Sequence, residues 1–595
     1  MWNYNKNLEN TVSLYNKTPF IQVDEKAEES VSGWGKIIDC LKKQIEDLRK
    51  PDTMVVINYY PGVNEEELLQ HLILPFGIIN SFNANDLFKA EAEIKQLTYP
   101  DVTDDPVFGY TTRLTLKDFF DEKKFHSSQQ HLKSIKGPSL VFGYGASLLV
   151  NAPSLLIYVD MPRWELQLRY RRKEINNLGV NNKGEKVSSQ YKRGFFVDWR
   201  VADKLKKETI TQWDYVLDTT KSLFPVMVSG NAYRYALQKT IQQPFRVVPF
   251  FDPGPWGGQW MKEVCDLDRK TINYAWCFDC VPEENSLLLK FGDIIFETPS
   301  INLVFYQSKQ LLGEAVQARF GDEFPIRFDL LDTMKGGNLS LQVHPTTEYI
   351  QECFGMHYTQ DESYYILDAE DDSCVYLGLK TDTNPELMVV ELEEAQERSI
   401  EFNVEKHVAK WPVKKHDHIL IPAGTVHCSG ANSMVLEISA TPYIFTFKLW
   451  DWGRMDLDGK PRPIKINHGK NVIDWSRTEE WVNKNLINTI EKVAEGEGWV
   501  EEKTGLHERE FIETRRHWFS KPVYHRANGS VSVFNLIEGK EAIIESPNGR
   551  FKPFLVHYAE TFIIPASIEE YTISPYGVSE GQLIGTIKAY VRHNS

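Results

Sequence analysis

The sequence predicts an α/β unit followed by two all-β barrels, and three features of the chain lead to this fold class. Up to about residue 240, apolar runs of strand length alternate with amphipathic stretches, as in a parallel, doubly wound sheet. After the Pro- and Gly-rich segment 251–258, many short strands separated by Gly, Asn and Asp turns replace that alternation. Finally, a segment near the C-terminus repeats one from the middle of the chain.

Within residues 1–240, the hydrophobic pattern predicts both helices and strands. Apolar residues recur at helical spacing over 37–48, and the basic segment 164–172 has the same period. Residues 53–57 and 154–160 are short apolar runs that suit buried strands. We therefore expect a parallel sheet covered by helices.

The remainder is predicted to divide into residues 245–500 and residues 505–595. Short strands, such as the one expected at 373–379, have the pattern of antiparallel barrels. A helix at 479–493 is expected to connect the two barrels.

Composition and charge narrow the possible functions. A net charge of −16, spread along the chain with no acidic tail, argues against nucleic acid, whose binding calls for basic patches, and a local cluster of Lys and Arg would have to meet any anionic substrate. The seven scattered cysteines, including CFDC at 277–280, fit buried thiols in a reducing cytoplasm. No signal pattern and no run near the roughly 18 apolar residues of a membrane span occur. We expect a cytoplasmic protein without a membrane partner, and the oligomeric state stays open.

Four polar side chains are expected to meet in the first barrel although they are distant in sequence. Gln342 and His344 are two residues apart in LQVHP (341–345), so they share one face of a strand. Glu362 begins a β-rich run, and His427 follows a Pro-Ala-Gly turn. This set suits one divalent ion, Zn²⁺ or else Fe²⁺, Co²⁺ or Mn²⁺, and leaves room for water or substrate oxygens.

The segment that is repeated near the C-terminus is the one that contains His427. IPASIEE (564–570) has the form of IPAGTVH (421–427), with Glu570 in the place of His427. We interpret residues 505–595 as a second barrel of the same type that has lost its metal.

The order of motifs in the first barrel resembles the type I phosphomannose isomerases, which are zinc-dependent cupins. The similarity covers about residues 245–590 and runs through WGG (256–258), PIRFDLLD (325–332), LQVHP (341–345), YYILDAE (364–370), YLGLK (376–380), IPAGTVH (421–427), LWDWGR (449–454) and DGKPRP (458–463). It implies two cupin (jelly-roll) barrels. It also implies that Gln342, His344, Glu362 and His427 hold the zinc.

The resemblance implies the interconversion of mannose 6-phosphate and fructose 6-phosphate through a cis-enediol. This reaction needs an electrophile for the carbonyl, a base that moves a proton between C2 and C1, and cations for the phosphate; the metal can supply the electrophile. Arg454, in LWDWGR, matches an arginine of the family's active site. It is predicted to bind the phosphate or to assist proton transfer.

One position departs from the family. Relatives usually carry a Lys two residues before the Glu ligand, whereas this chain has Gln360, which can neither supply positive charge nor carry a proton. Lys380, in the matching motif YLGLK, is predicted to help instead, with Lys335 and Lys448 as other sources of charge. The general base and the exact sugar phosphate stay open.

The N-terminal segment VVINYYPGVNEEELL (55–69) has the strand–turn–helix outline of a phosphate loop. A working loop has Lys and a hydroxyl where this chain has the acids of 65–67, which would repel a phosphate. Together with GYG (143–145), LIYVDMP (156–162) and RYRR (169–172), it is similar to uridine-kinase-like P-loop kinases. The similarity implies a degenerate, kinase-shaped domain without nucleotide chemistry; the alternative is another α/β domain with a basic helix.

Two other functions stay open. The fused N-terminal domain and Gln360 suit a non-catalytic, sugar-phosphate-binding regulatory protein. An iron-dependent cupin oxygenase is the other candidate, but such sites commonly keep three ligands and open positions, whereas Gln342 would fill a fourth.

Overall fold

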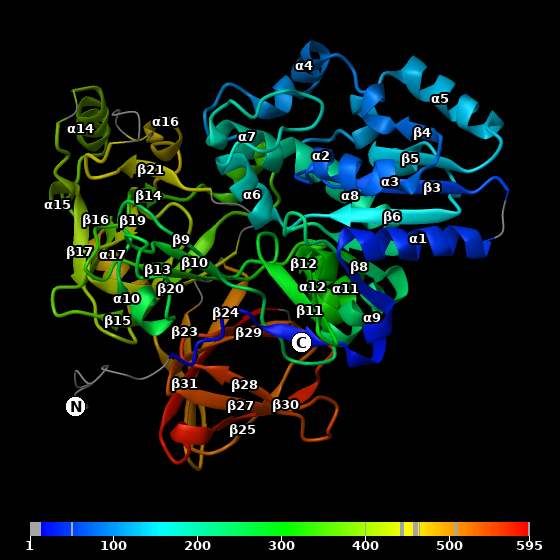
Figure 1. The fold of residues 1–595 in the computed structure, drawn as a ribbon. Coiled ribbons are helices and arrows are strands. Elements are labelled where there is room, and N and C mark those ends of the chain that lie inside the picture. The colour runs from blue at the N-terminus through cyan, green and yellow to red at the C-terminus, as the bar shows by residue number, and fades with distance from the viewer. Residues whose placement is uncertain are drawn as a thin grey trace.

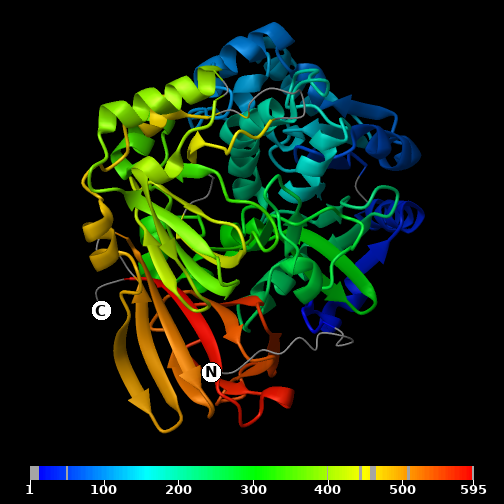
Figure 2. The same ribbon diagram turned by 90° about the vertical axis from the view of Figure 1, so that its left-hand side faces the viewer.

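The computed structural model describes residues 13–48, 51–398, 400–440, 445–455, 462, 464–505 and 510–592. They form an α/β unit, a first β-barrel beside it, and a second β-barrel that lies below both in the view of Figure 1. Figure 2 shows the same arrangement after a quarter turn. Among these residues, no helix has both the length and the apolar character that crossing a membrane requires.

The α/β unit is built on a mixed seven-stranded sheet. In spatial order its strands are β2 (Ser30–Ser32), β8 (Val226–Ser229), β7 (Tyr215–Asp218), β6 (Leu155–Asp160), β3 (Met54–Tyr59), β5 (Ser139–Tyr144) and β4 (Asn80–Asn83). The five strands from β7 to β4 are parallel. At one edge of the sheet, β8 pairs antiparallel with β7, and β2 pairs antiparallel with β8. Val56 and Ile157 are fully buried, as expected for strands covered on both faces. The predicted parallel sheet is confirmed for these five strands.

Helices cover both faces of this sheet. They are α1 (Trp34–Leu48), α2 (Glu65–Leu68), α3 (Leu74–Phe76), α4 (Glu91–Val102), α5 (Glu122–Ser134), α6 (Arg163–Arg171), α7 (Val187–Arg193), α8 (Trp199–Thr209) and α9 (Gly230–Thr240). The helices predicted at 37–48 and 164–172 are confirmed as α1 and α6. α6 and α7 lie on the side of the unit that faces the first barrel (Figure 1).

The first barrel consists of two sheets with antiparallel pairing. The six-stranded sheet has the order β18 (His418–Ile421), β15 (Asp361–Ala369), β20 (Ser433–Ala440), β13 (Arg327–Asp332), β10 (Trp276–Cys280) and β9 (Phe250–Asp252). The five-stranded sheet has the order β17 (Val408–Pro412), β16 (Cys374–Leu379), β19 (His427–Ser429), β14 (Leu341–Val343) and β21 (Phe447–Trp450). The strand predicted at 373–379 is confirmed as β16. Cys277 and Cys280 are buried, free thiols in β10, as expected.

Smaller elements join the barrel to the α/β unit. A three-stranded sheet pairs β1 (Phe20–Gln22) in parallel with β11 (Ser286–Phe291), which pairs with β12 (Ile294–Pro299). The helices after residue 250 are α10 (Trp260–Val264), α11 (Ile301–Leu312), α12 (Glu314–Phe320), α13 (Thr347–Phe354), α14 (Pro385–Arg398), α15 (Val404–His407), α16 (Ile466–Gly469) and α17 (Glu479–Asn485).

The second barrel also has two antiparallel sheets. One has the order β22 (Glu491–Gly496), β23 (Trp499–Gly505), β24 (Ile512–Phe519), β31 (Ile584–Val591), β26 (Ser532–Glu538) and β29 (Thr561–Ile564). The other has the order β25 (Val523–Arg526), β30 (Glu570–Pro575), β27 (Glu541–Glu545) and β28 (Phe554–His557). The repeated segment is a strand–turn–strand in both barrels, and Glu570 begins β30 as His427 begins β19.

The helix predicted at 479–493 is wrong in its second half. α17 ends at Asn485, and β22 begins at Glu491. The carbonyl of Leu486 accepts a hydrogen bond from the backbone N–H of Leu420 in β18. Asn488, which has a positive φ, then turns the chain toward β22. Residues 486–493 have the apolar spacing of a helix, but hydrogen bonding with the first barrel gives them another conformation. The last sheet thus reaches back to residue 491, ahead of the predicted boundary at 505.

The α/β unit and the first barrel share one contiguous hydrophobic core, which extends to Val533 and Ile563 of the second barrel. Other residues of the second barrel form a separate cluster in its interior. Phe108, from the α/β unit, lies among the rings of Phe354, Phe445 and Phe447, with ring centroids 5.2–5.5 Å apart. Burying such a ring stabilises the contact by about 2 kcal/mol. The α/β unit is therefore packed on the barrel rather than tethered to it.

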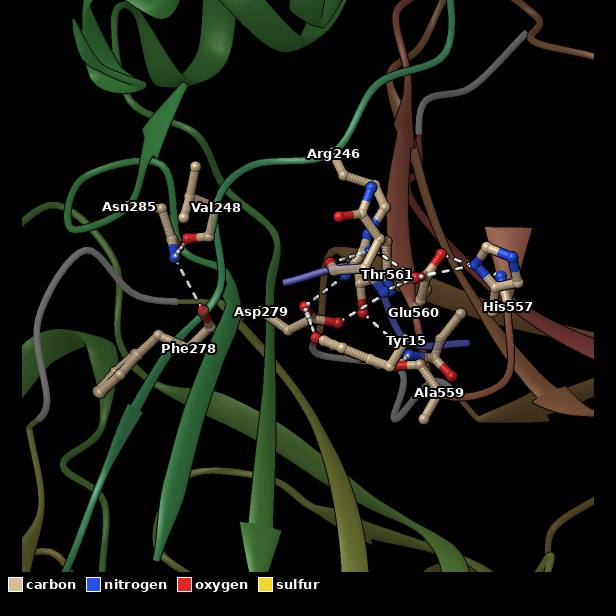
Figure 3. Close-up of polar contacts among 12 residues, drawn as sticks. Tyr15, Arg246, Val248, Phe278, Asp279, Asn285, His557, Ala559, Glu560 and Thr561 are labelled. Carbon is tan, nitrogen blue, oxygen red and sulfur yellow. Dashed lines mark hydrogen bonds and ion pairs between the residues drawn. The ribbon is translucent and has the colours of Figure 1, made fainter. Parts of the chain in front are cut away.

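A buried polar cluster joins the N-terminal segment, the first barrel and the second barrel (Figure 3). Arg246 lies 2.7 Å from the carboxylate of Glu560 and 3.5 Å from that of Asp279. Asp279 also accepts hydrogen bonds from the Tyr15 hydroxyl and from the backbone N–H of Thr561. These charges are buried but mutually paired, which fixes how the three segments meet.

Candidate metal centre

The four predicted side chains meet between the two sheets of the first barrel. Gln342 on β14 is paired directly with His427 on β19, His344 follows β14, and Glu362 lies on β15 of the opposite sheet. Nε2 of His344 is 3.0 Å from Oε2 of Glu362, and Nε2 of His427 is 2.9 Å from Oε1. Within the described part of the chain, no other group of three His, Cys, Asp or Glu residues is close enough to share an ion.

The backbone fixes the orientation of both imidazoles. Nδ1 of His344 lies 2.9 Å from the carbonyl of Phe445, and Nδ1 of His427 lies 2.9 Å from that of Thr425. Because a carbonyl only accepts hydrogen bonds, each Nδ1 carries a proton, and in a neutral ring Nε2 directs a lone pair at Glu362. Two lone pairs and a carboxylate about 3 Å apart repel one another unless a proton or a cation lies between them. This is the arrangement of metal-binding histidines, whose second nitrogen donates to a carbonyl.

Two atoms of this cluster lack a satisfactory partner. Nε2 of His344 and Oε1 of Glu362 are buried and form no hydrogen bond of acceptable geometry, although ionic contacts lie within 3.0 Å. These nitrogen and oxygen atoms are close to one another, but their directions are not those of a hydrogen bond. They point at a common centre rather than at each other. The Gln342 amide, 3.2 Å from Nε2 of His427, points to the same centre, and turning it over would present its oxygen there.

Glu362 keeps its charge in this environment. Burial by itself raises the pKa of a carboxyl, but when protons lie between the rings and the carboxylate, the positive charges of His344 and His427 and the hydrogen bonds from them outweigh burial and hold the pKa of Glu362 well below its ordinary value. The amide of Gln360 donates a 2.8 Å hydrogen bond to Oε2 of Glu362. Gln360 therefore reaches the cluster and orients its carboxylate.

Sequence reasoning missed two acids behind the cluster. Glu437 on β20 is directly opposite both Tyr364 of β15 and Asp329 of β13. Burial first, and then the charges of Glu362 and Asp329, raise the pKa of Glu437 well above its ordinary value. Burial, with a smaller contribution from Glu362, also raises the pKa of Asp329 to about 7. The available signal was a lone acid inside each of two apolar strands, MVLEIS (434–439) and RFDLL (327–331).

The structure places Arg454 in a separate cleft. It donates to Asp451 at 2.9 Å and to the carbonyl of Asn338, and Arg462 pairs with the same Asp451 at 2.7 Å. The cleft has a volume of about 390 Å³ and contains Trp452 but none of the four clustered residues. Of DGKPRP, residues 458–461 and 463 lie outside the described residues.

The predicted lysines lie at different places. The backbone N–H of Lys380 donates to His407, on the side of β16 away from β19, and Lys335 is exposed in a loop. Lys448 on β21 is directly opposite Gln342 of β14, and such pairs project from the same face of a sheet. Of the three lysines, Lys448 is the one whose register places it beside the cluster.

The loop that resembles a phosphate loop is filled by protein. Gly62 has a φ of +97°, and a Cβ there would lie 2.7 Å from Leu166. The guanidinium of Arg169 donates to the carbonyls of Gly62 and Thr219 at 2.9 and 2.7 Å. Asp160, at the end of β6, is paired with the buried ammonium of Lys206 at 2.8 Å. Arg169 and Asp160, two charged residues of the segments that the sequence singled out, are thus engaged within the protein.

Comparison with known proteins adds two results. Residues 33–242 match the model of a family described as Domain of unknown function (DUF8485). The chain is also homologous at low identity to mannose-6-phosphate isomerases. It is 24% identical over 233 residues to Mannose-6-phosphate isomerase ManA of Bacillus subtilis (39% of this chain and 68% of the relative). It is 24% identical over 240 residues to Mannose-6-phosphate isomerase of Streptococcus mutans (39% and 70%).

Solved structures show a more distant likeness. The mannose 6-phosphate isomerase from Bacillus subtilis superposes with a TM-score of 0.48 and 18% identity, covering 58% of this chain and 99% of that one. A point mutant of phosphomannose isomerase from Salmonella typhimurium gives 0.45 and 13%, covering 58% and 99%. At these scores the likeness is too distant to assign a fold by itself.

Proposed function

We propose that this protein is a metal-dependent aldose–ketose isomerase that interconverts mannose 6-phosphate and fructose 6-phosphate. The observation that carries the proposal is the pair of imidazoles whose Nε2 atoms converge on the Glu362 carboxylate while their Nδ1 atoms are held by carbonyls. Homology to mannose-6-phosphate isomerases supports the choice of reaction.

In this proposal Gln342, His344, Glu362 and His427 hold Zn²⁺ or another divalent transition metal. Two imidazoles, a carboxylate and an amide, with no thiolate, are compatible with several such ions. The bound ion would polarise the substrate carbonyl and stabilise charge on the oxygens of the enediol.

The protein side chains supply the remaining chemistry. Glu437 lies in the row of side chains next to Glu362 and is the best-placed acid for moving a proton between C1 and C2 of the substrate. Lys448, opposite Gln342, is the best-placed cation for the charge that develops on the substrate oxygens. Arg454 and Lys380, for which the sequence predicted these roles, form no hydrogen bond or ion pair with the cluster among the described residues; Arg454 is engaged by Asp451 and Asn338.

We further infer that the chain has an α/β domain over about 1–240, a metal-binding cupin domain from about 245, and a second cupin-like barrel that starts near β22. A degenerate, kinase-shaped α/β domain agrees with the loop at Gly62 being occupied by Leu166 and Arg169. The three acids of α2, starting at Glu65, agree with the absence of phosphate chemistry there.

A non-catalytic sugar-phosphate sensor is the second candidate. Gln360 favours it, because its amide contacts Glu362 where a lysine would bring positive charge. The two functions differ in proton exchange.

The test is solvent deuterium incorporation at C2 of mannose 6-phosphate. The isomerase proposal expects exchange and turnover that a chelator abolishes and that one divalent metal restores. A matched double variant, His344→Ala with His427→Ala, should bind no metal and catalyse no exchange. Binding of mannose 6-phosphate without exchange in the metal-loaded protein would favour the sensor instead.

A further inference from the structure

A cleft of about 400 Å³ lies between the α/β unit and the first barrel. One wall comes from α6 and α7, and the other from β9, β10 and β13. The residues that define it are Trp164, Arg171, Tyr191, Phe250, Phe278 and Arg327. Its volume, its place between two domains and its aromatic lining with a few charged groups are typical of a small-molecule site.

The barrel wall of this cleft lies on the same sheet face as the candidate metal centre. Glu362 is directly opposite Ser439, which is directly opposite Arg327, so these three side chains form one row. In the next row, Asp329 is directly opposite Phe278. With neighbouring strands about 4.8 Å apart, Arg327 lies about 10 Å from Glu362 across the sheet and Phe278 about 14 Å. One sheet face therefore leads from the metal centre into the cleft.

Buried oxygens without partners lie along this face. Oγ of Ser439 and Oδ1 of Asp329 are both inaccessible and form no hydrogen bond within the described residues. Buried polar atoms are ordinarily paired, so a water or a ligand hydroxyl that displaced the side chains covering these two oxygens would gain a hydrogen bond at each. A sugar lying on this face could offer a hydroxyl to each.

The cleft also contains two guanidinium groups. Arg327 comes from the barrel, and Arg171 comes from α6, where it pairs with Asp252 through two 2.8 Å hydrogen bonds. A second carboxylate of the cleft, Glu284, accepts from Gln167 of the α/β unit. Each guanidinium lies beside a carboxylate, because Arg171 is paired with Asp252 and Arg327 lies 3.8 Å from Asp329. A phosphate in the cleft would compete with these carboxylates for the local cations that a chain of net charge −16 needs to bind an anion.

We propose that this cleft is the phosphate-binding end of the sugar-phosphate site, and that the α/β unit supplies its outer wall. The sugar extends from the metal centre across the two adjacent rows that contain Ser439 and Asp329, and its phosphate lies between Arg327 and Arg171. Trp164, whose ring stacks on Phe250 at 3.8 Å, forms the apolar side. The inference rests on the proposed function and assigns the N-terminal domain a part in substrate binding.

A labelling experiment tests occupancy without relying on turnover. Ser188 of α7 lines the cleft and is exposed, so a Ser188→Cys variant places a thiol there. Cys40 and Cys353, the cysteines that are not buried, are replaced by Ser. Mannose 6-phosphate should slow maleimide labelling at 188, whereas mannose should not, and a Ser127→Cys control on α5 should label equally with and without ligand.

Kinetics test the charge. Arg171→Gln should raise KM for mannose 6-phosphate about 10-fold with kcat within about 2-fold, because binding to the phosphate is common to ground and transition states. Arg171→Lys should restore most of the affinity. Arg172→Gln is the matched control, since Arg172 pairs with Glu165 and Glu174 and does not line the cleft.

The outcomes separate this inference from the proposed function. Two results in an active isomerase would overturn the cleft assignment alone. One is that mannose 6-phosphate does not slow maleimide labelling of the Ser188→Cys variant. The other is that Arg171→Gln and Arg172→Gln have the same KM for mannose 6-phosphate. Absence of isomerase exchange in the metal-loaded protein would overturn the proposed function. Protection at position 188 by mannose 6-phosphate would still support a sugar-phosphate site in the cleft.

Discussion

Substituting Lys448 by Gln should lower kcat about 100-fold. Lys448 is directly opposite Gln342, and the Cα atoms of such pairs are about 5 Å apart. An ammonium about 6 Å from the oxygen that gains charge, at an effective dielectric constant of about 20, stabilises it by about 3 kcal/mol. By transition-state theory this free energy corresponds to a factor of about 100 in rate.

The assay is a coupled isomerase assay in which metal content is measured on the same samples. Lys448→Arg keeps the charge and should lose less than the Gln variant. Arg454→Gln is the comparison, and it should cost less than about 10-fold because Arg454 is engaged by Asp451 and Asn338 in another cleft. A Lys448→Gln enzyme within about 3-fold of the parent, or a larger loss in Arg454→Gln, would refute the placement of positive charge.

Three further outcomes are expected. Glu437→Gln should lower kcat at least about 100-fold while metal content is unchanged, if this acid moves the proton; equal loss of metal and activity would contradict that role. Glu560→Gln should lower the free energy of unfolding in urea by about 3 kcal/mol, because it removes a partner 2.7 Å from buried Arg246; a change under about 0.5 kcal/mol would contradict the importance of that cluster. Burial raises the pKa of Glu283 from 4.5 to about 7, so the native state binds a proton that the unfolded chain has lost, and stability falls as pH rises from about 4.5 to 7. Glu283→Gln should therefore unfold like the parent near pH 4 and be more stable by at most about 3 kcal/mol at pH 8, and a gain confined to low pH would contradict the sign.

Much of the architecture could be predicted because it depends on local periodicity. The buried run that became β3 and the amphipathic run that became α1 are clear in the sequence. The segment after Asn485 was misjudged because its conformation depends on pairing with β18, a partner far away in the chain.

In the candidate site, too, some features follow from the local sequence and others depend on residues that are distant in the chain. Gln342, His344, Glu362 and His427 were predicted to meet because of their residue types and strand spacing, and in the structure they lie around one point. The sequence could not show which of several lysines lies nearest these residues, because the position of Lys448 depends on the register of β21 with β14. The cleft could not be anticipated at all, since its walls come from separate units.

Metal analysis of the purified protein, with exchange at C2 of mannose 6-phosphate followed on the same samples, tests the central claim most directly. We expect about one divalent ion per chain, loss of ion and exchange together on chelation, and neither in the variant in which His344 and His427 are both replaced by Ala. Full exchange by a metal-free sample, or an ion retained by that double variant, would contradict the claim that these four side chains form the catalytic metal site.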